Sequence, residues 1–129
     1  MNLLLDTHIF LWYISGDARL ALHHRDSIRD PSNRVYLSVA SVWEAVIKHA
    51  IGKLALPQSP AAYLPQQRRG HRIDSLPIEE SPLAELASLP PLHRDPFDRL
   101  LVAQALFYGM TLVTVDPLIQ AYPVPVLPI

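Results

Sequence analysis

Short apolar runs alternate with segments of helical periodicity along the whole chain, and this alternation constrains the fold more than any other feature. The strand-like runs are Asn2–Leu5, Val35–Leu37, Arg72–Leu76 and Thr111–Val115, and the proline-rich tail from Tyr122 allows one last edge strand. Helices are predicted over residues 9–14, 17–30, 38–50, a polar segment through Arg68 and Arg69, 79–88 and 96–108. This order is typical of an α/β domain with a largely parallel sheet.

The composition narrows the class of protein. A chain of 129 residues corresponds to one domain, residues 1–129, and half of its residues are hydrophobic. Cysteine is absent, which excludes a disulfide framework, a thiolate metal site and a thiol nucleophile, and fits a cytoplasmic protein. Because the formal net charge is −1, a nucleic-acid-binding surface would have to come from a local group of basic residues.

Acidic residues stand where the predicted strands end. Asp6 follows the first strand and Asp116 follows the last, and either could simply cap the next helix or turn. The carboxyl ends of parallel strands meet at one edge of a sheet, where open α/β proteins bind ligands. We therefore expect Asp6 and Asp116 to lie close together at that edge.

The segment HRDPFDRLLVAQA begins a helix that is apolar almost all round. Asp95 is a good N-cap, Pro96 suits the first helical position, and Asp98 in the first turn suits the helix dipole. A helix of this composition belongs in the interior of a protein. Asp98 is therefore predicted at the mouth of a buried element, near the same sheet edge.

The helix SVASVWEAVIKHA carries one narrow polar stripe, formed by Ser41, Glu44 and Lys48 at spacings of three and four. The stripe is either an ordinary solvent face with a Glu–Lys pair or a set of side chains directed at the acidic edge. Glu44 lies close enough to the start of its helix to reach that edge.

Four converging carboxylates repel each other unless protons or cations compensate their charge. Carboxylate oxygens favour Mg²⁺ or Mn²⁺, and such ions activate water in phosphodiester cleavage. The six histidines show no zinc-type spacing, and His93 is expected to pack a loop. The chain has no GxSxG segment, no Walker-type loop and only four glycines.

At these residues the chain resembles PIN-domain proteins, in particular VapC-type toxins of bacterial and archaeal type II toxin–antitoxin systems. The matching segments are LLLDTH, SVASVWEAVIKHAIGKL, LPPLHRDPFDRLLVAQAL and TLVTVD, in family order and across essentially the whole chain. The most specific patterns are HxDPFDRLL and WExxIKxxxGKL. The resemblance implies a three-layer PIN-like fold: a mostly parallel sheet of about five short strands with helices on both faces.

The resemblance also implies an activity, the cleavage of RNA phosphodiester bonds by a Mg²⁺- or Mn²⁺-dependent endoribonuclease. Carried over by position, the catalytic and metal-binding acids are Asp6, Glu44, Asp98 and Asp116. The hydroxyls that the family often places beside these acids are Thr7, Ser41 and Thr114. Family members usually form homodimers and bind a cognate antitoxin that blocks the acidic site, so both partners are expected here.

Our hypothesis for the site is that the three aspartates hold one or two Mg²⁺ ions while Glu44 binds metal or positions water. Lys48 either orients Glu44 or contacts phosphate, and Arg99 either pairs with an acid or contacts RNA. RNA must also find positive charge near the acids. The candidates, each of which is otherwise a solvated face, are Arg68, Arg69 and Arg72 and the helix bearing Arg19, His23, Arg25 and Arg29.

Two other classes of protein remain open from the sequence. A metal-dependent phosphatase or phosphotransfer domain also places acids at strand ends, although His8 stands where the common DxD type has its second aspartate. A non-catalytic binding module could use the same acids to seat an arginine from a partner. Metal titration and phosphomonoester turnover separate these classes from a ribonuclease.

Overall fold

A computed structural model describes residues 1–129 and shows a four-stranded sheet in the order β3-β2-β1-β4. All three strand pairs are parallel, which confirms the predicted α/β class. The strands are β1 Asn2–Leu5, β2 Arg34–Ser38, β3 Asp74–Leu76 and β4 Thr111–Val113. In place of the fifth strand expected in the tail, Val126 forms a single parallel bridge to Leu112 beside β4.

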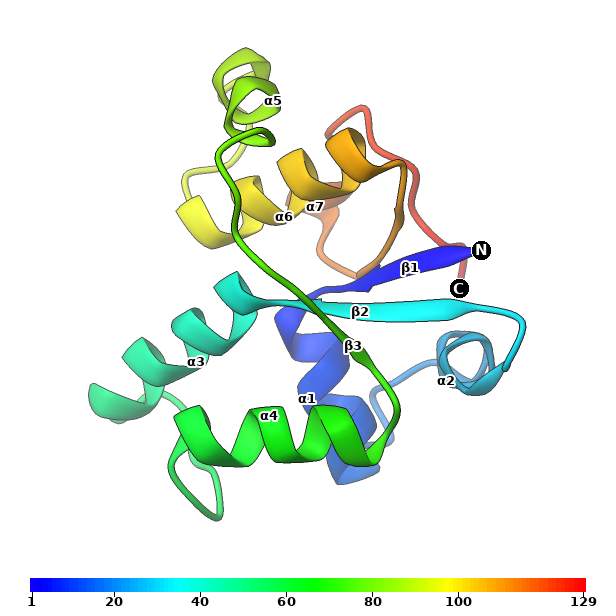
Figure 1. Ribbon diagram of the computed structural model, residues 1–129, viewed down its shortest axis with the longest axis vertical. Coiled ribbons are helices and arrows are strands. Elements are labelled where there is room, and N and C mark those ends of the chain that lie inside the picture. Colours follow the sequence, from blue (N-terminus) through cyan, green and yellow to red (C-terminus); the bar gives the residue numbers. More distant parts are fainter.

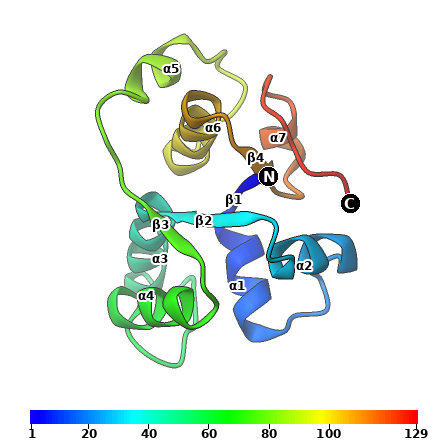
Figure 2. The same ribbon diagram turned by 45° about the vertical axis from the view of Figure 1, so that its right-hand side comes forward.

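Helices cover both faces of this sheet (Figures 1 and 2). The group on one side is α1 Thr7–Ser15, α2 Leu22–Arg29, α3 Val39–Ala50 and α4 Pro60–Gly70. The group on the other side is α5 Leu83–Ser88, α6 Pro96–Tyr108 and α7 Pro117–Gln120. No helix is both long enough and apolar enough to cross a membrane.

The alternation of side chains along β1 divides the interior into two apolar cores. Leu3 and Leu5 point into a core shared with α1, α2 and α4, whereas Leu4 points into a core shared with α6 and α7. All three leucines are fully buried. The segment LLL is therefore a central strand that is apolar on both faces, as expected where helices cover a parallel sheet on both sides.

The helix predicted from Asp17 begins later than expected, at Leu22. Asp17 instead forms a turn, because its carboxylate accepts the backbone N–H of Arg19 and its carbonyl accepts the N–H of Leu20. The helix predicted over 79–88 likewise begins only at Leu83, since Pro82 disfavours helical backbone in the residue before it.

Two predicted strands are shorter than expected, each for a local reason. The strand predicted over Arg72–Leu76 begins at Asp74, because Arg72 has a positive φ of 57° that lies outside the extended region. The strand predicted over Thr111–Val115 ends at Val113, and Thr114 then turns its side chain toward Asp6.

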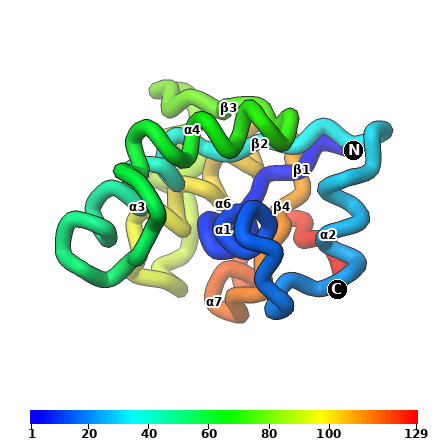
Figure 3. The backbone as a smooth tube through the Cα atoms, turned by 90° about the horizontal axis from the view of Figure 1, so that it is seen from below, coloured from blue at the N-terminus to red at the C-terminus, as the bar shows by residue number.

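The carboxyl ends of the strands lead toward α3, and both chain termini lie toward the opposite end of the molecule (Figure 3). At this edge α6 begins with the predicted cap, since the Asp95 carboxylate accepts the backbone N–H groups of Phe97 and Asp98. Gln104, the polar residue inside apolar α6, is buried between Ser38 and the carbonyl of Pro77, with which it hydrogen-bonds. The edge is thus built from β1, β4, α3 and α6 together.

Candidate active site

One cavity of about 440 Å³ at this edge brings together all four of the acids predicted from the sequence. Asp6 comes from the end of β1 and Glu44 from the second turn of α3. Asp98 comes from the first turn of α6, and Asp116 caps α7 through the backbone N–H of Leu118. Asp116 therefore both caps α7 and lines the cavity.

Asp6 and Glu44 form a buried wall of this cavity in which hydroxyl groups hold each carboxylate. The Thr114 hydroxyl donates to Asp6 Oδ2 at 2.8 Å, and the Thr7 hydroxyl donates to Glu44 Oε1 at 2.7 Å. The Ser41 hydroxyl lies 2.9 Å from that of Thr7 and can donate to it. Each of the three hydroxyls predicted to stand beside the acids thus hydrogen-bonds to an acid, directly or through one other hydroxyl.

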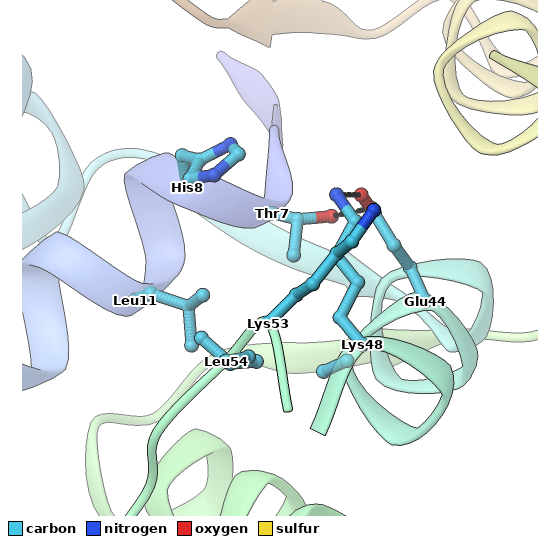
Figure 4. Close-up of a pocket in the computed structure, with 8 residues that line it drawn as sticks. Thr7, His8, Leu11, Glu44, Lys48, Lys53 and Leu54 are labelled. Atoms are coloured by element: carbon cyan, nitrogen blue, oxygen red, sulfur yellow. Dashed lines mark hydrogen bonds and ion pairs between the residues drawn. The ribbon is translucent and has the colours of Figure 1, made fainter. Parts of the chain in front are cut away.

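Lys48 closes this wall from the solvent side. Its ammonium group contacts the second oxygen of Glu44 one helical turn away, as Figure 4 shows. Burial lowers the pKa of Lys48, but the hydrogen bond and the charge of Glu44 outweigh this effect and raise the pKa overall. Lys48 therefore stays charged, and Glu44 and Lys48 of the polar stripe line the cavity while Ser41 is buried against Thr7.

Asp98, Asp116 and His93 form the opposite wall. His93 Nε2 lies 2.8 Å from Asp98 Oδ2 and 3.7 Å from Asp116 Oδ2. Since His93 Nδ1 accepts the backbone N–H of Asp95, the neutral ring carries its proton on Nε2, between the two acids. The expectation that His93 merely packs a loop is wrong, because the ring lines the acidic cavity.

Burial and mutual repulsion make two of these carboxyls hard to ionise. Burial raises the pKa of Asp6, although the Thr114 hydrogen bond opposes the shift. Burial, together with the negative charges of Asp6, Asp95 and Glu44, raises the pKa of Asp98 to about 7. The negative charge that gathers around Asp6 and Asp98 is therefore only partly compensated by the side chains around it.

The family model for the PIN domain matches residues 3–124 of this chain. The chain belongs to the PIN-domain family. A Mycobacterium tuberculosis protein named Ribonuclease VapC16 is 40% identical over 45 residues, a segment that is 35% of this chain and 32% of that relative.

Two solved structures share the PIN fold with this chain across nearly its full length. A crystal structure of VapBC2 from Rickettsia felis bound to a DNA fragment from their promoter matches with a TM-score of 0.73 and 16% identity, covering 99% of this chain and 98% of that one. VapBC-1 from nontypeable Haemophilus influenzae matches with a TM-score of 0.57 and 21% identity, covering 91% and 88%. At these identities the likeness establishes the fold alone.

The donor set of this PIN domain fits a divalent cation. One ligand atom from each of His93, Asp98 and Asp116 can be chosen so that all three lie within 4.8 Å of one another. His93 Nε2 is buried against Asp98 and Asp116, and because the proton of the neutral ring lies there, the two carboxylates would be the cation ligands and the ring a neighbouring donor. Hard carboxylate oxygens in this number suit Mg²⁺ or Mn²⁺, whose charge would offset the repulsion that raises the pKa of Asp98.

Arg99 lies away from the cavity, although the sequence suggested contact with an acid or with RNA. Its guanidinium donates to the carbonyl of Pro90 and to the hydroxyl of Tyr122, each at 3.0 Å. These bonds tie the loop before α6 to the segment after α7. Trp12 and Arg19, by contrast, line the acidic cavity, and Arg19 is held there by a bidentate contact with Asp17.

Proposed function

We propose that this PIN-domain chain is a Mg²⁺- or Mn²⁺-dependent endoribonuclease, the toxin of a VapC-type toxin–antitoxin pair. The observation that carries this proposal is the convergence of Asp6, Glu44, Asp98 and Asp116 in one cavity. The partial match to a protein named Ribonuclease VapC16 supports the same activity. A function inside the cytoplasm follows from this assignment, since the substrate is cellular RNA.

In this proposal the three aspartates hold one or two divalent cations, and the bound cation would lower the pKa of a water molecule and offset charge on the scissile phosphate. Glu44 is held by Thr7 and Lys48, so its carboxylate keeps a defined direction toward the cavity and can bind the cation or accept a proton from water. His93 Nε2–H points between Asp98 and Asp116 and can donate to a phosphate oxygen or to a water molecule.

Protein partners are part of the same proposal. The outer face of α3 exposes a run of apolar side chains at helical spacing, namely Val39, Trp43, Val46, Ile47 and Ile51. Exposed apolar surface of this kind marks protein–protein contacts. The solved structures of similar fold carry VapBC names, which supports an antitoxin that covers the acidic cavity, and we also expect the chain to form a homodimer.

The test is the replacement of single acids. Asp6→Asn and Asp98→Asn should each reduce metal-dependent RNA cleavage by about 100-fold or more, since each removes a charge that positions the cation. Glu80→Gln, which changes an exposed acid outside the cavity, is the matched control and should cleave normally. Circular dichroism and thermal melting of each variant show whether the fold is intact.

Full activity of either aspartate variant would overturn the site assignment. Turnover of a phosphomonoester with RNA left intact would favour a phosphatase instead. Absence of Mg²⁺ or Mn²⁺ binding in calorimetry of the isolated chain would favour a non-catalytic module. Mapping RNA ends after expression of this chain with and without a cognate antitoxin would then identify the cleaved RNA.

A further inference from the structure

A second cavity, of about 240 Å³, adjoins the acidic one (Figure 4). His8, Glu44 and Lys48 line both cavities, so the two lie side by side. The second cavity also contains Lys53, whose side chain extends in the same direction as that of Lys48 (Figure 4). Two lysines therefore line a cavity that shares Glu44 with the acidic one.

The end of α3 explains why Lys53 faces this cavity. The Lys53 backbone N–H donates to the carbonyl of Lys48 at 2.8 Å, and Gly52 adopts a left-handed conformation with φ of 75°. This pattern is a helix C-cap that reverses the chain direction and favours glycine. No atom lies within 4 Å of a Cβ added at Gly52, so glycine is needed for the turn and not for space.

Lys53 differs from the other lysine and arginine side chains that line the two cavities in having no acidic partner. The Lys48 ammonium is paired with Glu44, and the Arg19 guanidinium is paired with Asp17. Lys53 takes part in no ion pair within 4.0 Å. Its exposed charge is thus free to meet an incoming anion beside the acids.

We propose that Lys53, supported by Lys48, binds an RNA phosphate adjacent to the one that is cleaved, and that Gly52 positions it for this contact. The proposal rests on the proposed ribonuclease function. A polyanion can approach the acidic cavity only where positive charge lies next to it, and lysine ammonium groups are common phosphate ligands. Lys53 is therefore a positioning residue for substrate and takes no part in the bond-breaking step.

The test measures binding of a short labelled single-stranded RNA by fluorescence anisotropy over a range of salt concentrations, in an Asp98→Asn background that does not cleave. Lys53→Ala should weaken binding by about three- to tenfold and reduce the slope of log affinity against log salt by about 0.7, the value for one phosphate contact in single-stranded nucleic acid. Lys53→Arg should retain most of the affinity. Gly52→Ala, which keeps the lysine but strains the turn, should reproduce part of the loss.

Arg34→Ala is the matched control, because it removes one exposed positive charge at the start of β2, and Arg34 lines neither cavity. An equal change of slope in Arg34→Ala and Lys53→Ala would overturn the proposal, because the effect would then be a general one of net charge. Unchanged affinity and slope in Lys53→Ala would overturn it as well.

Cleavage by the otherwise unaltered chain separates the two proposals. If that chain cleaves RNA and Lys53→Ala has the same KM, the phosphate contact is wrong while the ribonuclease stands. If RNA binds with the expected dependence on Lys53 but is not cleaved, the ribonuclease is wrong while the contact stands. Absence of both binding and cleavage overturns both.

Discussion

The two walls of the acidic cavity hold their carboxylates in different ways. Asp6 and Glu44 are 5% and 3% exposed, and each accepts a hydrogen bond from a threonine hydroxyl. The side chains of Asp98 and Asp116 are 13% and 32% exposed, and the polar side chain between them is His93. Hydrogen bonds within the protein hold the carboxylates of the first wall without a ligand. The negative charge of the second wall would be balanced by a bound ligand.

Thr114 connects the two walls. Its hydroxyl donates to Asp6 and accepts the backbone N–H of Asp116 at 3.1 Å. A shift of one wall is therefore transmitted to the other through a single side chain. This link accounts for the short β4, because Thr114 leaves the sheet to make both contacts.

The largest expected effect on stability comes from ionisation of the Asp98 carboxyl in the second wall. The pKa of Asp98 is about 7 in the folded chain and 3.8 in a model peptide, so between these pH values the folded state holds a proton that the unfolded state has lost. The stabilising contribution is complete below pH 3.8 and is lost as the pH rises through 7.

We therefore expect the metal-free protein to lose about 2 kcal/mol of unfolding free energy between pH 4 and 8, roughly half of the full linkage value because the carboxyl is partly exposed to solvent. Urea titrations at a series of pH values measure this loss. The variant Asp98→Asn should show a flatter dependence over the same window, and added Mg²⁺ should restore stability at pH 8. Identical pH curves for the two proteins would contradict the charge imbalance assigned to the second wall.

A smaller effect is expected from the first wall. Thr114→Val keeps the shape of the side chain but removes the hydroxyl that serves the buried Asp6 carboxylate, which should cost about 1 to 1.5 kcal/mol of unfolding free energy. Thr111→Val is the matched control, because Thr111 lies three residues earlier, at the start of β4, and its hydroxyl makes no hydrogen bond to a protein group. Equal denaturation midpoints for the two variants would show that the first wall is not held by this bond.

Much of this arrangement could be predicted from the sequence because it follows from local rules. The apolar segment Asn2–Leu5 and the cap Asp95–Pro96 specify their own structures, and both are present as expected. Acids placed directly after parallel strands must meet at one edge, so the proximity of Asp6 and Asp116 needs only the order of elements. Prediction from the sequence therefore succeeds for features that are determined within one segment of the chain or by the order of the elements.

The features that sequence reasoning missed depend on how side chains are directed once the elements have packed. His93 opens the HxDPFDRLL pattern, but its place between the acids also depends on Asp116, which comes from a distant segment of the chain. Lys53 faces the second cavity because α3 ends in a left-handed glycine. The polar stripe of α3 was predicted to face either solvent or the acidic edge, and the structure shows Glu44 buried at that edge while Trp43 is 54% exposed.

The smallest effect is expected from Arg99, which belongs to neither wall. Arg99→Gln removes hydrogen bonds to the Pro90 carbonyl and the Tyr122 hydroxyl, and should lower the unfolding free energy by about 0.5 to 1 kcal/mol. RNA cleavage at saturating substrate and metal affinity should stay within about twofold of the unaltered chain, since the guanidinium does not line the acidic cavity. A loss of cleavage as large as that of Asp98→Asn, in a folded variant, would mean that the second wall depends on the loop that Arg99 ties down. The loop that carries His93 would then count as part of the second wall, because the Tyr122 hydroxyl also accepts the His93 backbone N–H at 2.9 Å.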